Sequence, residues 1–420
     1  MKSLGRLFSP MLPAMDAGNA QPLSEWIVAQ GLQGTDETTV LDVLCARLTA
    51  DGLPLLRVNI CQPTLHPVIG GHLFIWQRGR GGAVEEDWAR NVAAAGRDYA
   101  RTPFEYMMTT GVPSWRKRLV AGDNLGEFPM LDRFRAQGGT DYLALQEIFG
   151  AGHRLGPADR VLTSWLTDAA EGFAEGQLAA IERLMPPLAL AVKATATYRI
   201  ASSVIETYLG KDAGQRVLGG TIERGAGETI RAALWFCDLQ GFTKLSDTMP
   251  RDALLALMHE YFECMVSTID EHGGHVLKFM GDGLLAIFNR GEDGASCRTA
   301  LEAADVAVER VAQLTARRQA AGLPATRFYL ALHLGDALYG NIGARNRLDF
   351  TVIGPAVNEV SRIEAMCRAL DQDLIVSAAF AAAVGACDRL VSLGRYVLRG
   401  VRQPQELFTL VARDAEGQTT

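Results

Sequence analysis

The chain has 420 residues, of which 48% are hydrophobic and 21% charged, and its formal net charge is −7. This length predicts two or three domains, and the composition is that of a globular protein able to bury hydrophobic cores. The negative charge balance excludes the basic footprint of a nucleic-acid-binding protein, so no nucleic-acid partner is expected.

The seven cysteines are odd in number and none forms a Cys-x-x-Cys pair. This argues for reduced thiols and against a disulfide scaffold or a zinc site. The most apolar stretch, near residues 184–192, is short and carries Pro186 and Pro187, so no membrane span is expected. Residues 1–6 lack the apolar core of a signal peptide, and we therefore expect a cytoplasmic protein.

The N-terminal half has the pattern of short strands followed by a long helix. Residues 1–20 are rich in Pro, Gly and Ala and are expected to form a flexible tail. Thr35 or Asp36 is expected to cap a helix, because apolar residues recur at helical spacing after it. Strands are then predicted at Pro54 to Cys61, His72 to Trp76, Tyr106 to Met108, around Trp115, at 140–145 and at Leu162 to Leu166. A helix is expected from about Ala174 and, after an interruption at the Pro-Pro pair, again to about Leu209, an order that indicates an antiparallel α+β domain.

This pattern resembles a GAF-like sensor domain over residues 21–195. The resemblance rests on Gly-Thr-Asp-Tyr-Leu-Ala-Leu at 139–145 and on Gly-Phe-Ala-Glu at 172–175, which opens the long helix. It implies regulation by a small-molecule ligand whose identity the residues do not give. Several aromatic residues either line a ligand pocket or belong to the core: Trp76, Tyr106, Trp115, Tyr142 and Trp165.

Residues 196–228 are expected to form a signalling helix and linker. Apolar residues recur on one helix face, a stripe expected to pair with its counterpart in a dimer: Val192, Ala196, Ile200, Val204 and Tyr208. The Gly-rich stretch 210–227 is expected to be the boundary of the next domain.

The C-terminal half alternates strands and helices. Strands are predicted at Ala232 to Cys237, His275 to Phe279, Leu284 to Phe288, Arg327 to Leu334, Leu348 to Ile353 and Leu374 to Val376. Helices are predicted after Pro250, at about 295–320 and at Ala356 to Leu370, from their apolar stripes. The core order is βαββαβ, which predicts a ferredoxin-like sheet. The hairpin around Gly-Asp-Gly is expected to bring Asp282 beside Asp238.

Three short motifs in this half carry residues suited to chemistry on a nucleoside triphosphate: Phe-Cys-Asp-Leu-Gln-Gly-Phe-Thr at 236–243, Lys-Phe-Met-Gly-Asp-Gly at 278–283 and Val-Asn-Glu-Val-Ser-Arg at 357–362. Each has an ordinary explanation: Asp238 as a helix cap, Asp-Gly as a hairpin turn, and Asn358 with Arg362 as a solvated helix face. Together they indicate a site, because divalent cations bind carboxylates plus substrate phosphates. A Gly at 241 also lets backbone N–H groups approach phosphate oxygens.

With these motifs, residues 229–412 resemble a class III nucleotidyl cyclase, specifically a bacterial adenylate cyclase of the Thr-type base-reading subgroup, and 413–420 remain as a tail. The resemblance implies conversion of ATP to 3′,5′-cyclic AMP and pyrophosphate, the activity of a phosphorus-oxygen lyase. It also implies sites shared by the two chains of a homodimer, with two Mg²⁺ or Mn²⁺ ions in each. The metals are expected on Asp238, Asp282 and the backbone carbonyl of Leu239.

The resemblance also implies the substrate contacts. The β- and γ-phosphates are expected on Gln240, Gly241, Phe242 and Thr243, with Arg399 as a further phosphate ligand. Lys278 and Thr351 are expected to read the base, since lysine donates to adenine ring nitrogens and a threonine hydroxyl accepts from the exocyclic amine. Asn358 is expected to orient the ribose, and Arg362 to stabilise the charge of the transition state.

Two other functions stay open at this point. A guanylate cyclase is opposed by Lys278 with Thr351, because guanylate cyclases typically carry Glu and Cys at these positions. A catalytically inactive cyclase-like regulatory protein is opposed by the presence of both aspartates and of Arg362. A diguanylate cyclase has no support, since its Gly-Gly-Asp-Glu-Phe signature is absent.

Overall fold

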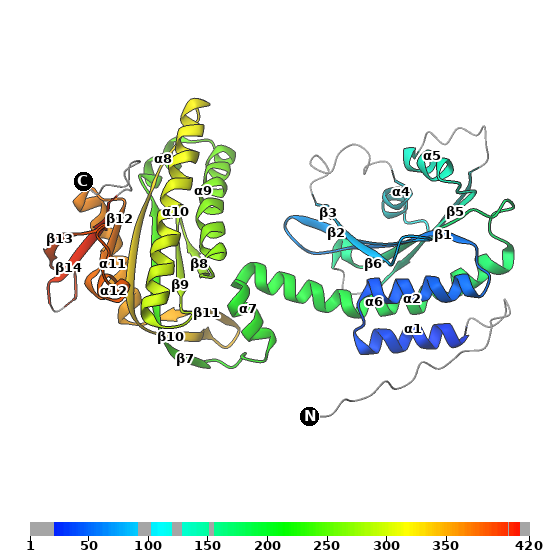
Figure 1. The fold of residues 1–420 in the computed structure, drawn as a ribbon, viewed down its shortest axis with the longest axis horizontal. Coiled ribbons are helices and arrows are strands. Elements are labelled where there is room, and N and C mark those ends of the chain that lie inside the picture. Colours follow the sequence, from blue (N-terminus) through cyan, green and yellow to red (C-terminus); the bar gives the residue numbers. More distant parts are fainter. Residues whose placement is uncertain (1–20, 91–101, 120–127, 151–154, 402, 412–420) are drawn as a thin grey trace. The chain divides into compact units, whose positions relative to one another are not determined.

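The computed structural model describes residues 21–90, 102–119, 128–150, 155–401 and 403–411. The chain divides into two compact units, Met1–Val204 and Ile205–Thr420, and each is described by itself (Figure 1). The tails expected at 1–20 and 413–420 lie outside the described residues. Within the described ranges, no helix combines the length and apolarity needed to cross a membrane.

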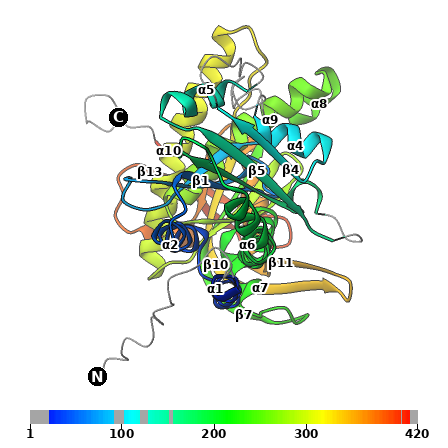
Figure 2. The same ribbon diagram turned by 90° about the vertical axis from the view of Figure 1, so that its right-hand side faces the viewer.

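The N-terminal unit is a six-stranded antiparallel sheet with helices on both faces (Figure 1, Figure 2). The strand order is β3-β2-β1-β6-β5-β4, from β1 Leu55–Pro63, β2 Ile69–Gln77, β3 Val84–Ala89, β4 Ser114–Arg118, β5 Asp141–Ile148 and β6 Arg160–Thr167. One face packs on α1 Gln21–Gln33, α2 Glu37–Ala50 and α6 Glu175–Leu209, and the other on α4 Pro103–Thr110 and α5 Pro129–Ala136. The predicted antiparallel α+β class is confirmed.

Helix α2 begins where the sequence predicts, because the Asp36 carboxylate accepts a hydrogen bond from the backbone N–H of Thr39 at 2.8 Å. The strand predicted at Tyr106 to Met108 is wrong, since this segment lies in helix α4. The Thr102 hydroxyl caps α4 by accepting from the backbone N–H of Glu105, and Gly111 ends it in the left-handed conformation at φ 76°. Caps at both ends of this eight-residue helix therefore outweigh the strand preference of the aromatic residue.

Most of the aromatic residues proposed for a ligand pocket are core residues. Trp165, Tyr142 and Trp76 are 0%, 1% and 8% exposed. Trp115 packs edge-on against Tyr142, with ring centroids 6.0 Å apart. Tyr106 is 39% exposed on α4. The core alternative from the sequence is therefore the better one for the three buried rings.

Helix α6 runs without a break through Pro186 and Pro187, where the sequence predicts an interruption. Both prolines lie toward solvent, and so do Glu182 and Arg183 one turn earlier, whose carbonyls lose their usual partner. Water can therefore satisfy these carbonyls, and the helix continues.

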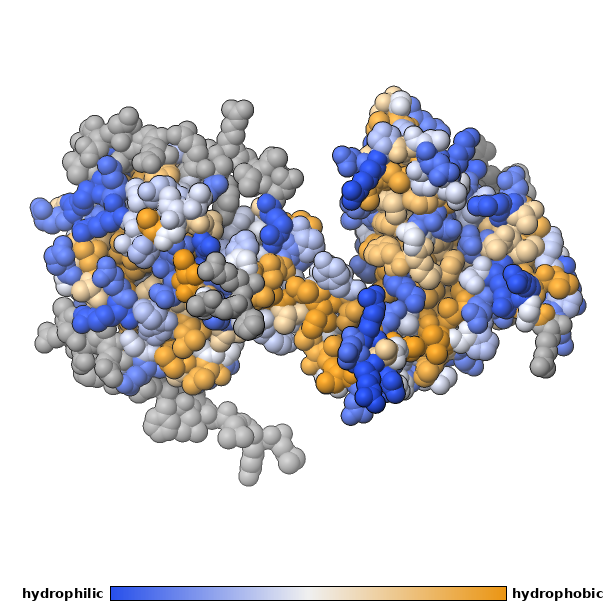
Figure 3. All heavy atoms as spheres, turned by 180° about the vertical axis from the view of Figure 1, so that it is seen from behind, coloured by the Kyte–Doolittle hydropathy of each residue, from blue (hydrophilic) through white to orange (hydrophobic). Residues whose placement is uncertain are grey.

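The apolar stripe of α6 is largely buried within the N-terminal unit, so the expectation that all of it pairs with a second copy is wrong. Val192, Ala196 and Ile200 are 2%, 6% and 7% exposed, and Val192 belongs to the core of this unit. Only the end of the stripe is strongly exposed to solvent, at Tyr208, which is 82% exposed. Across the face drawn in Figure 3, hydrophobic residues are interspersed with hydrophilic ones.

The C-terminal unit is built on one eight-stranded sheet with the order β13-β14-β12-β10-β7-β9-β8, and β11 pairs with β10. The strands are β7 Gly227–Leu239, β8 His275–Met280, β9 Gly283–Phe288, β10 Phe328–Ala344, β11 Arg347–Ile353, β12 Leu374–Ser377, β13 Leu390–Tyr396 and β14 Gln405–Leu410. The helices are α7 Lys211–Leu218, α8 Phe242–Thr248, α9 Arg251–Glu271, α10 Asp293–Ala320, α11 Pro355–Leu370 and α12 Ala378–Val384. The antiparallel core β10-β7-β9-β8 confirms the predicted βαββαβ order.

Strand β7 divides its side chains between two cores. Trp235 and Cys237 face the core that includes α9 and α10, whereas Leu234 belongs to the core shared with α11. Because side chains alternate along a strand, Asp238 lies on the α11 face. This alternation places the first candidate carboxylate beside a helix that carries further charged residues.

Candidate active site

Asp238 and Asp282 are brought together by strand pairing. Asp238 lies opposite Gly283 in the β7–β9 ladder, and Asp282 directly precedes Gly283 in the turn after β8. A Cβ atom at Gly283 would lie 2.4 Å from the carbonyl oxygen of Cys237 and 3.0 Å from Oδ1 of Asp238. Only glycine therefore permits this close approach of the two strands.

The electrostatics of this pair are unfavourable without a cation. The pKa of Asp238 is raised to about 7, first through burial and then through the hydrogen bond with Asp282, the charge of Asp282 and the charge of Glu364. Glu364, on α11, also has a raised pKa, first through burial and then through the charge of Asp282. Carboxylates held close together suit a divalent cation, so these residues fit the metal that the sequence implies.

Glu364 was missed by sequence reasoning, which stopped at Arg362. A signal was present, because Glu364 follows the third motif by two residues. On an α-helix this spacing turns a side chain by about 200°, so Glu364 points away from the face that carries Arg362.

The loop after β7 has the backbone expected of a tight turn, but some of its side chains already bind or pack against other residues of the same chain. Gly241 adopts the left-handed conformation at φ 65°. The Gln240 amide donates to Oδ1 of Asp373 at 2.6 Å, and Phe242 packs against the core formed with α9 and α10. Thr243 is exposed. Of these residues, Gly241 and Thr243 are thus the freer candidates for phosphate contacts.

The two base-reading candidates lie on strands that the fold brings close. Lys278 on β8 donates to Oδ2 of Asp349 on β11 at 3.4 Å. Thr351, two residues further along β11, is 3% exposed, and its buried hydroxyl has no hydrogen-bond partner among the described residues. A buried hydroxyl without a partner is costly, so a ligand that bonds to the Thr351 hydroxyl would relieve that cost. Asp349 was missed, although its spacing from Thr351 places it on the same strand face.

Asn358 and Arg362 lie on α11, one turn apart. Asn358 is exposed, and Arg362 makes no salt bridge with any described residue, although its charge lowers the otherwise burial-raised pKa of Glu359. The Arg362 guanidinium lies close to Gly400, where an added Cβ would be 3.4 Å from its Nη2 atom. The neighbouring Arg399 is exposed. Two arginines that are expected to act on the phosphates, Arg362 and Arg399, are therefore found near Gly400.

The candidate residues therefore form separate groups within one chain. Asp238, Asp282 and Glu364 interact with one another. Within the described ranges, no hydrogen bond or ion pair joins the two aspartates to Lys278 or Arg362.

Comparison with known proteins finds a family that most of this unit resembles. Residues 226–412 match the model of the adenylate and guanylate cyclase catalytic domain. An adenylate cyclase of Anabaena cylindrica is 32% identical over 159 residues, which are 37% of this chain and 31% of that protein. Adenylate cyclase 1 of Rhizobium meliloti (strain 1021) is 27% identical over 183 residues, which are 42% of this chain and 27% of that protein. The match thus spans less than a third of either relative.

Among solved structures, the adenylyl cyclase CyaB from P. aeruginosa is similar to 46% of this chain and 99% of that chain, with 22% identity and a TM-score of 0.42. The sequence match covers β7 to β14, the elements that carry every candidate residue described above. The comparisons thus support an adenylate and guanylate cyclase catalytic domain over residues 226–412.

Proposed function

We propose that the protein is an adenylate cyclase that converts ATP to 3′,5′-cyclic AMP and pyrophosphate. The observation that carries the proposal is the approach of Asp238 and Asp282 at the end of β7, where Asp238 lies opposite Gly283 and its pKa is raised to about 7. Carboxylates this close repel one another and destabilise the fold, and a bound divalent cation would offset that repulsion. The names of the two curated relatives support the choice of ATP.

Asp238, Asp282 and the backbone carbonyl of Leu239 would hold Mg²⁺ or Mn²⁺, two ions in each site. When bound, the ions make the ribose 3′-hydroxyl more acidic and neutralise the leaving pyrophosphate. The 3′ oxygen then forms its bond to the α-phosphorus while the bond from that phosphorus to the bridging oxygen breaks with its electron pair. The hydroxyl proton leaves to solvent, so the atoms and charges balance.

Lys278 and Thr351 would select the base. The lysine ammonium donates to a ring nitrogen of adenine, and the buried Thr351 hydroxyl accepts from the exocyclic amine and so gains the partner that it lacks. Asp349, 3.4 Å from Lys278, would fix the orientation of the lysine.

A guanylate cyclase is the second candidate, because Asp349 offers a specific observation in its favour. Guanine presents N–H donors on the edge where adenine presents an acceptor, and the carboxylate of Asp349 can accept from them. Lys278 opposes this candidate, since it has no acceptor for those donors. The ratio of ATP to GTP turnover decides between the two.

We also propose that the active site is shared by two copies of the chain. Among the described residues, no hydrogen bond or ion pair joins Asn358 or Arg362 to the aspartates of their own chain, so they would act on the substrate held by the partner's metal site. There Asn358 would orient the ribose, while Arg362 would stabilise the charge that grows in the transition state. A positioned donor of this kind is worth about 3 kcal/mol.

The N-terminal unit would act as a GAF-like sensor of an unidentified small molecule. Its support is the antiparallel sheet with helices on both faces and the continuity of α6, which begins on this unit and ends beyond its boundary. A change in how α6 packs on the sensor would then alter how two catalytic units meet. This would make the protein a signal-transduction enzyme in the cytoplasm.

The experiment is a turnover assay of the purified full-length protein with Mn²⁺ or Mg²⁺ and with ATP or GTP in parallel, quantifying both cyclic nucleotides. We expect cyclic AMP as the main product, and none when a chelator is present. GTP turnover as fast as ATP turnover contradicts the assigned specificity, and absence of either product contradicts the enzyme assignment.

A further inference from the structure

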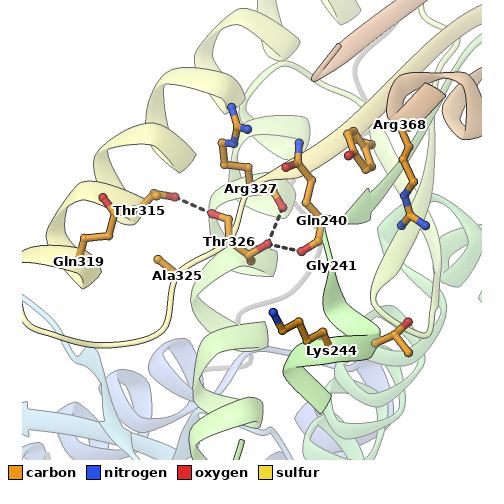
Figure 4. Close-up of a pocket in the computed structure, with 11 residues that line it drawn as sticks. Gln240, Gly241, Lys244, Thr315, Gln319, Ala325, Thr326, Arg327 and Arg368 are labelled. Atoms are coloured by element: carbon orange, nitrogen blue, oxygen red, sulfur yellow. Dashed lines mark hydrogen bonds between the residues drawn. The ribbon is translucent and has the colours of Figure 1, made fainter. Parts of the chain in front are cut away.

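The N-terminal unit carries a cluster of metal-ligating side chains outside the candidate active site. The cavity drawn in Figure 4 belongs to the active site, because Gln240 and Gly241 of the loop after β7 line it. The cluster instead consists of His72 on β2 with Glu85 and Asp87 on β3. Each of the three offers one nitrogen or oxygen atom, and these atoms lie within 4.8 Å of one another. An imidazole with two carboxylates is a donor set that suits zinc and other divalent transition metals.

Strand pairing places all three side chains on one face of the sheet. Asp87 lies opposite His72 in the β2–β3 ladder, and Glu85 lies opposite Phe74, a core residue on the face that carries α6. Residues two apart on a strand share a face, so the cluster lies on that face too. Nδ1 of His72 is 3.1 Å from Oε1 of Glu85 and 2.7 Å from Oδ1 of Asp87. Zinc bonds of about 2.1 Å at tetrahedral angles separate two ligand atoms by about 3.4 Å, so small side-chain shifts would admit the ion.

A buried amide without partners continues the same row of side chains. Gln62 on β1 pairs with His72 in the β1–β2 ladder, so Gln62, His72 and Asp87 lie side by side across three strands. Gln62 is 1% exposed, and neither its amide oxygen nor its amide nitrogen has a hydrogen-bond partner among the described residues. Leaving both atoms unpaired is costly. This amide therefore points independently to a ligand, since its oxygen would bond to the ion or to a water on the ion.

The charges around the cluster leave an excess of negative charge. Arg199 on α6 donates to Oε1 of Glu85 at 2.9 Å and to Oε2 of Glu37 at 2.7 Å, so one arginine serves two acids. Asp87 contacts His72 and forms no salt bridge with a lysine or arginine that the structure describes. A histidine that ligates a metal is neutral, so three carboxylates would face one arginine. A divalent cation would balance that difference.

We propose that this cluster, with His72, Glu85 and Asp87 as ligands, binds a divalent transition-metal ion of the zinc class. The proposal does not depend on the cyclase function, because it concerns the other unit and other residues. Three protein ligands leave a coordination position open, which suits an ion that exchanges with solution. Bound to Glu85, the ion would compete with Arg199 and so alter a contact by which α6 packs on this sheet.

The test counts zinc per chain after equilibrium dialysis of the full-length protein against Zn²⁺, with excess Mg²⁺ present to compete for the carboxylates of the active site. Asp87→Asn should weaken binding at the new site at least about tenfold, because even the outer-shell partners of metal ligands contribute that much. Glu86→Gln is the matched control, since Glu86 is an exposed acid between the two ligands on β3 and points to the opposite face. Zinc held at the active site is common to both variants and cancels in the difference.

His72→Gln serves as a second variant, because it removes the nitrogen donor and should lose the same zinc. The Asp87 side chain is 49% exposed on the edge strand β3, so Asp87→Asn should fold, and thermal unfolding of the metal-free protein checks this. Equal zinc content and affinity in the Asp87→Asn and Glu86→Gln proteins overturns the proposal. Absence of zinc from the wild-type protein overturns it as well.

Hydrogen exchange tests the link to α6. Zn²⁺ should change the exchange of α6 amides around Arg199 in the wild type and in Glu86→Gln, but not in Asp87→Asn. Zinc binding that depends on Asp87 without this change retains the metal site and rejects the competition with Arg199. Neither readout uses turnover, so failure of the cyclase assignment would leave both results standing.

Discussion

The two units of this chain place carboxylates in different surroundings. In the N-terminal unit, the fully buried Asp141 accepts from Arg116 at 2.7 Å and from the backbone N–H of Phe173 at 3.0 Å. Glu37, 2% exposed, is likewise paired with Arg199 at 2.7 Å. In the C-terminal unit, Asp238 faces Asp282 and Glu364 instead. Paired acids hold a fold together, whereas clustered acids store repulsion that a cation can relieve.

The largest expected effect comes from removing one clustered acid. Asp282→Asn should lower cyclase activity about a thousandfold, as expected for loss of a group that stabilises transition-state charge. The fold should persist or become slightly more stable, because the substitution removes repulsion from Asp238. Cyclic AMP formation and thermal unfolding are measured together. Asp336→Asn, at a 64% exposed acid of the same unit, is the control and should remain active; equal activity of both variants refutes the metal assignment.

A core substitution in the N-terminal unit should show the reverse pattern. Trp165 is 0% exposed and donates from its ring nitrogen to Thr163 at 2.9 Å. Trp165→Ala should destabilise this unit by about 3–5 kcal/mol. Hydrogen exchange should accelerate in β1, β5 and β6 and stay unchanged in β7 and β9. Acceleration of equal size in both units shows that they do not unfold independently, against the division drawn here.

Lowering the pH should decrease the free energy of unfolding of the C-terminal unit, because His333 titrates differently in the folded and unfolded states. Burial lowers the pKa of His333 to about 4 from 6.5, and Arg231 contributes to the decrease. Below pH 6.5 the unfolded chain takes up a proton that the folded unit refuses, so stability should fall as the pH decreases. The loss from this residue is about 2 kcal/mol between pH 6.5 and pH 5.

His333→Gln should remove that part of the pH dependence. Urea unfolding of the wild type and the variant at both pH values isolates the contribution, because the other titrating groups cancel in the difference. If the free energy of unfolding changes equally with pH in both proteins, His333 is charged or solvated in the folded state. That result would contradict its 6% exposure.

The smallest effect concerns specificity. Lys278→Glu combined with Thr351→Cys should shift the ratio of ATP to GTP turnover toward GTP about tenfold or more, because the new carboxylate accepts from guanine and no longer donates to adenine. Asp349→Asn provides the comparison, and a larger shift in this variant assigns base reading to Asp349. An unchanged ratio in both variants places base recognition elsewhere.

The sequence predicted the C-terminal core well because each element carries a long apolar stripe bounded by turn residues. It predicted the approach of Asp238 and Asp282 because the hairpin around Gly281 and Gly283 fixes the register. It did not predict Glu364 as part of this neighbourhood. The contribution of Glu364 arises from how α11 packs on the sheet, which a local pattern does not contain.

Elements of both units were not predicted. They are helices α1 and α5 with strand β3 in the N-terminal unit, and helices α7, α8 and α12 with strands β13 and β14 in the C-terminal unit, while α4 was assigned to a strand. Apart from α1, the missed helices are short, and short helices depend on caps and neighbours. The stripe on α6 was recognised, but its partner was not. An apolar helix face predicts that another surface packs on it, and only the fold shows that this surface is largely the core of the N-terminal unit itself.

The measurement that tests the central claim most directly is complementation between Asp282→Ala and Arg362→Ala. Each homodimer should be nearly inactive. In a heterodimer, one site carries both lesions and the other carries none, so free subunit exchange should restore about a quarter of wild-type ATP cyclisation. Recovery near that level supports a cyclase whose two chains build each site together. Verified heterodimers without recovery contradict the account.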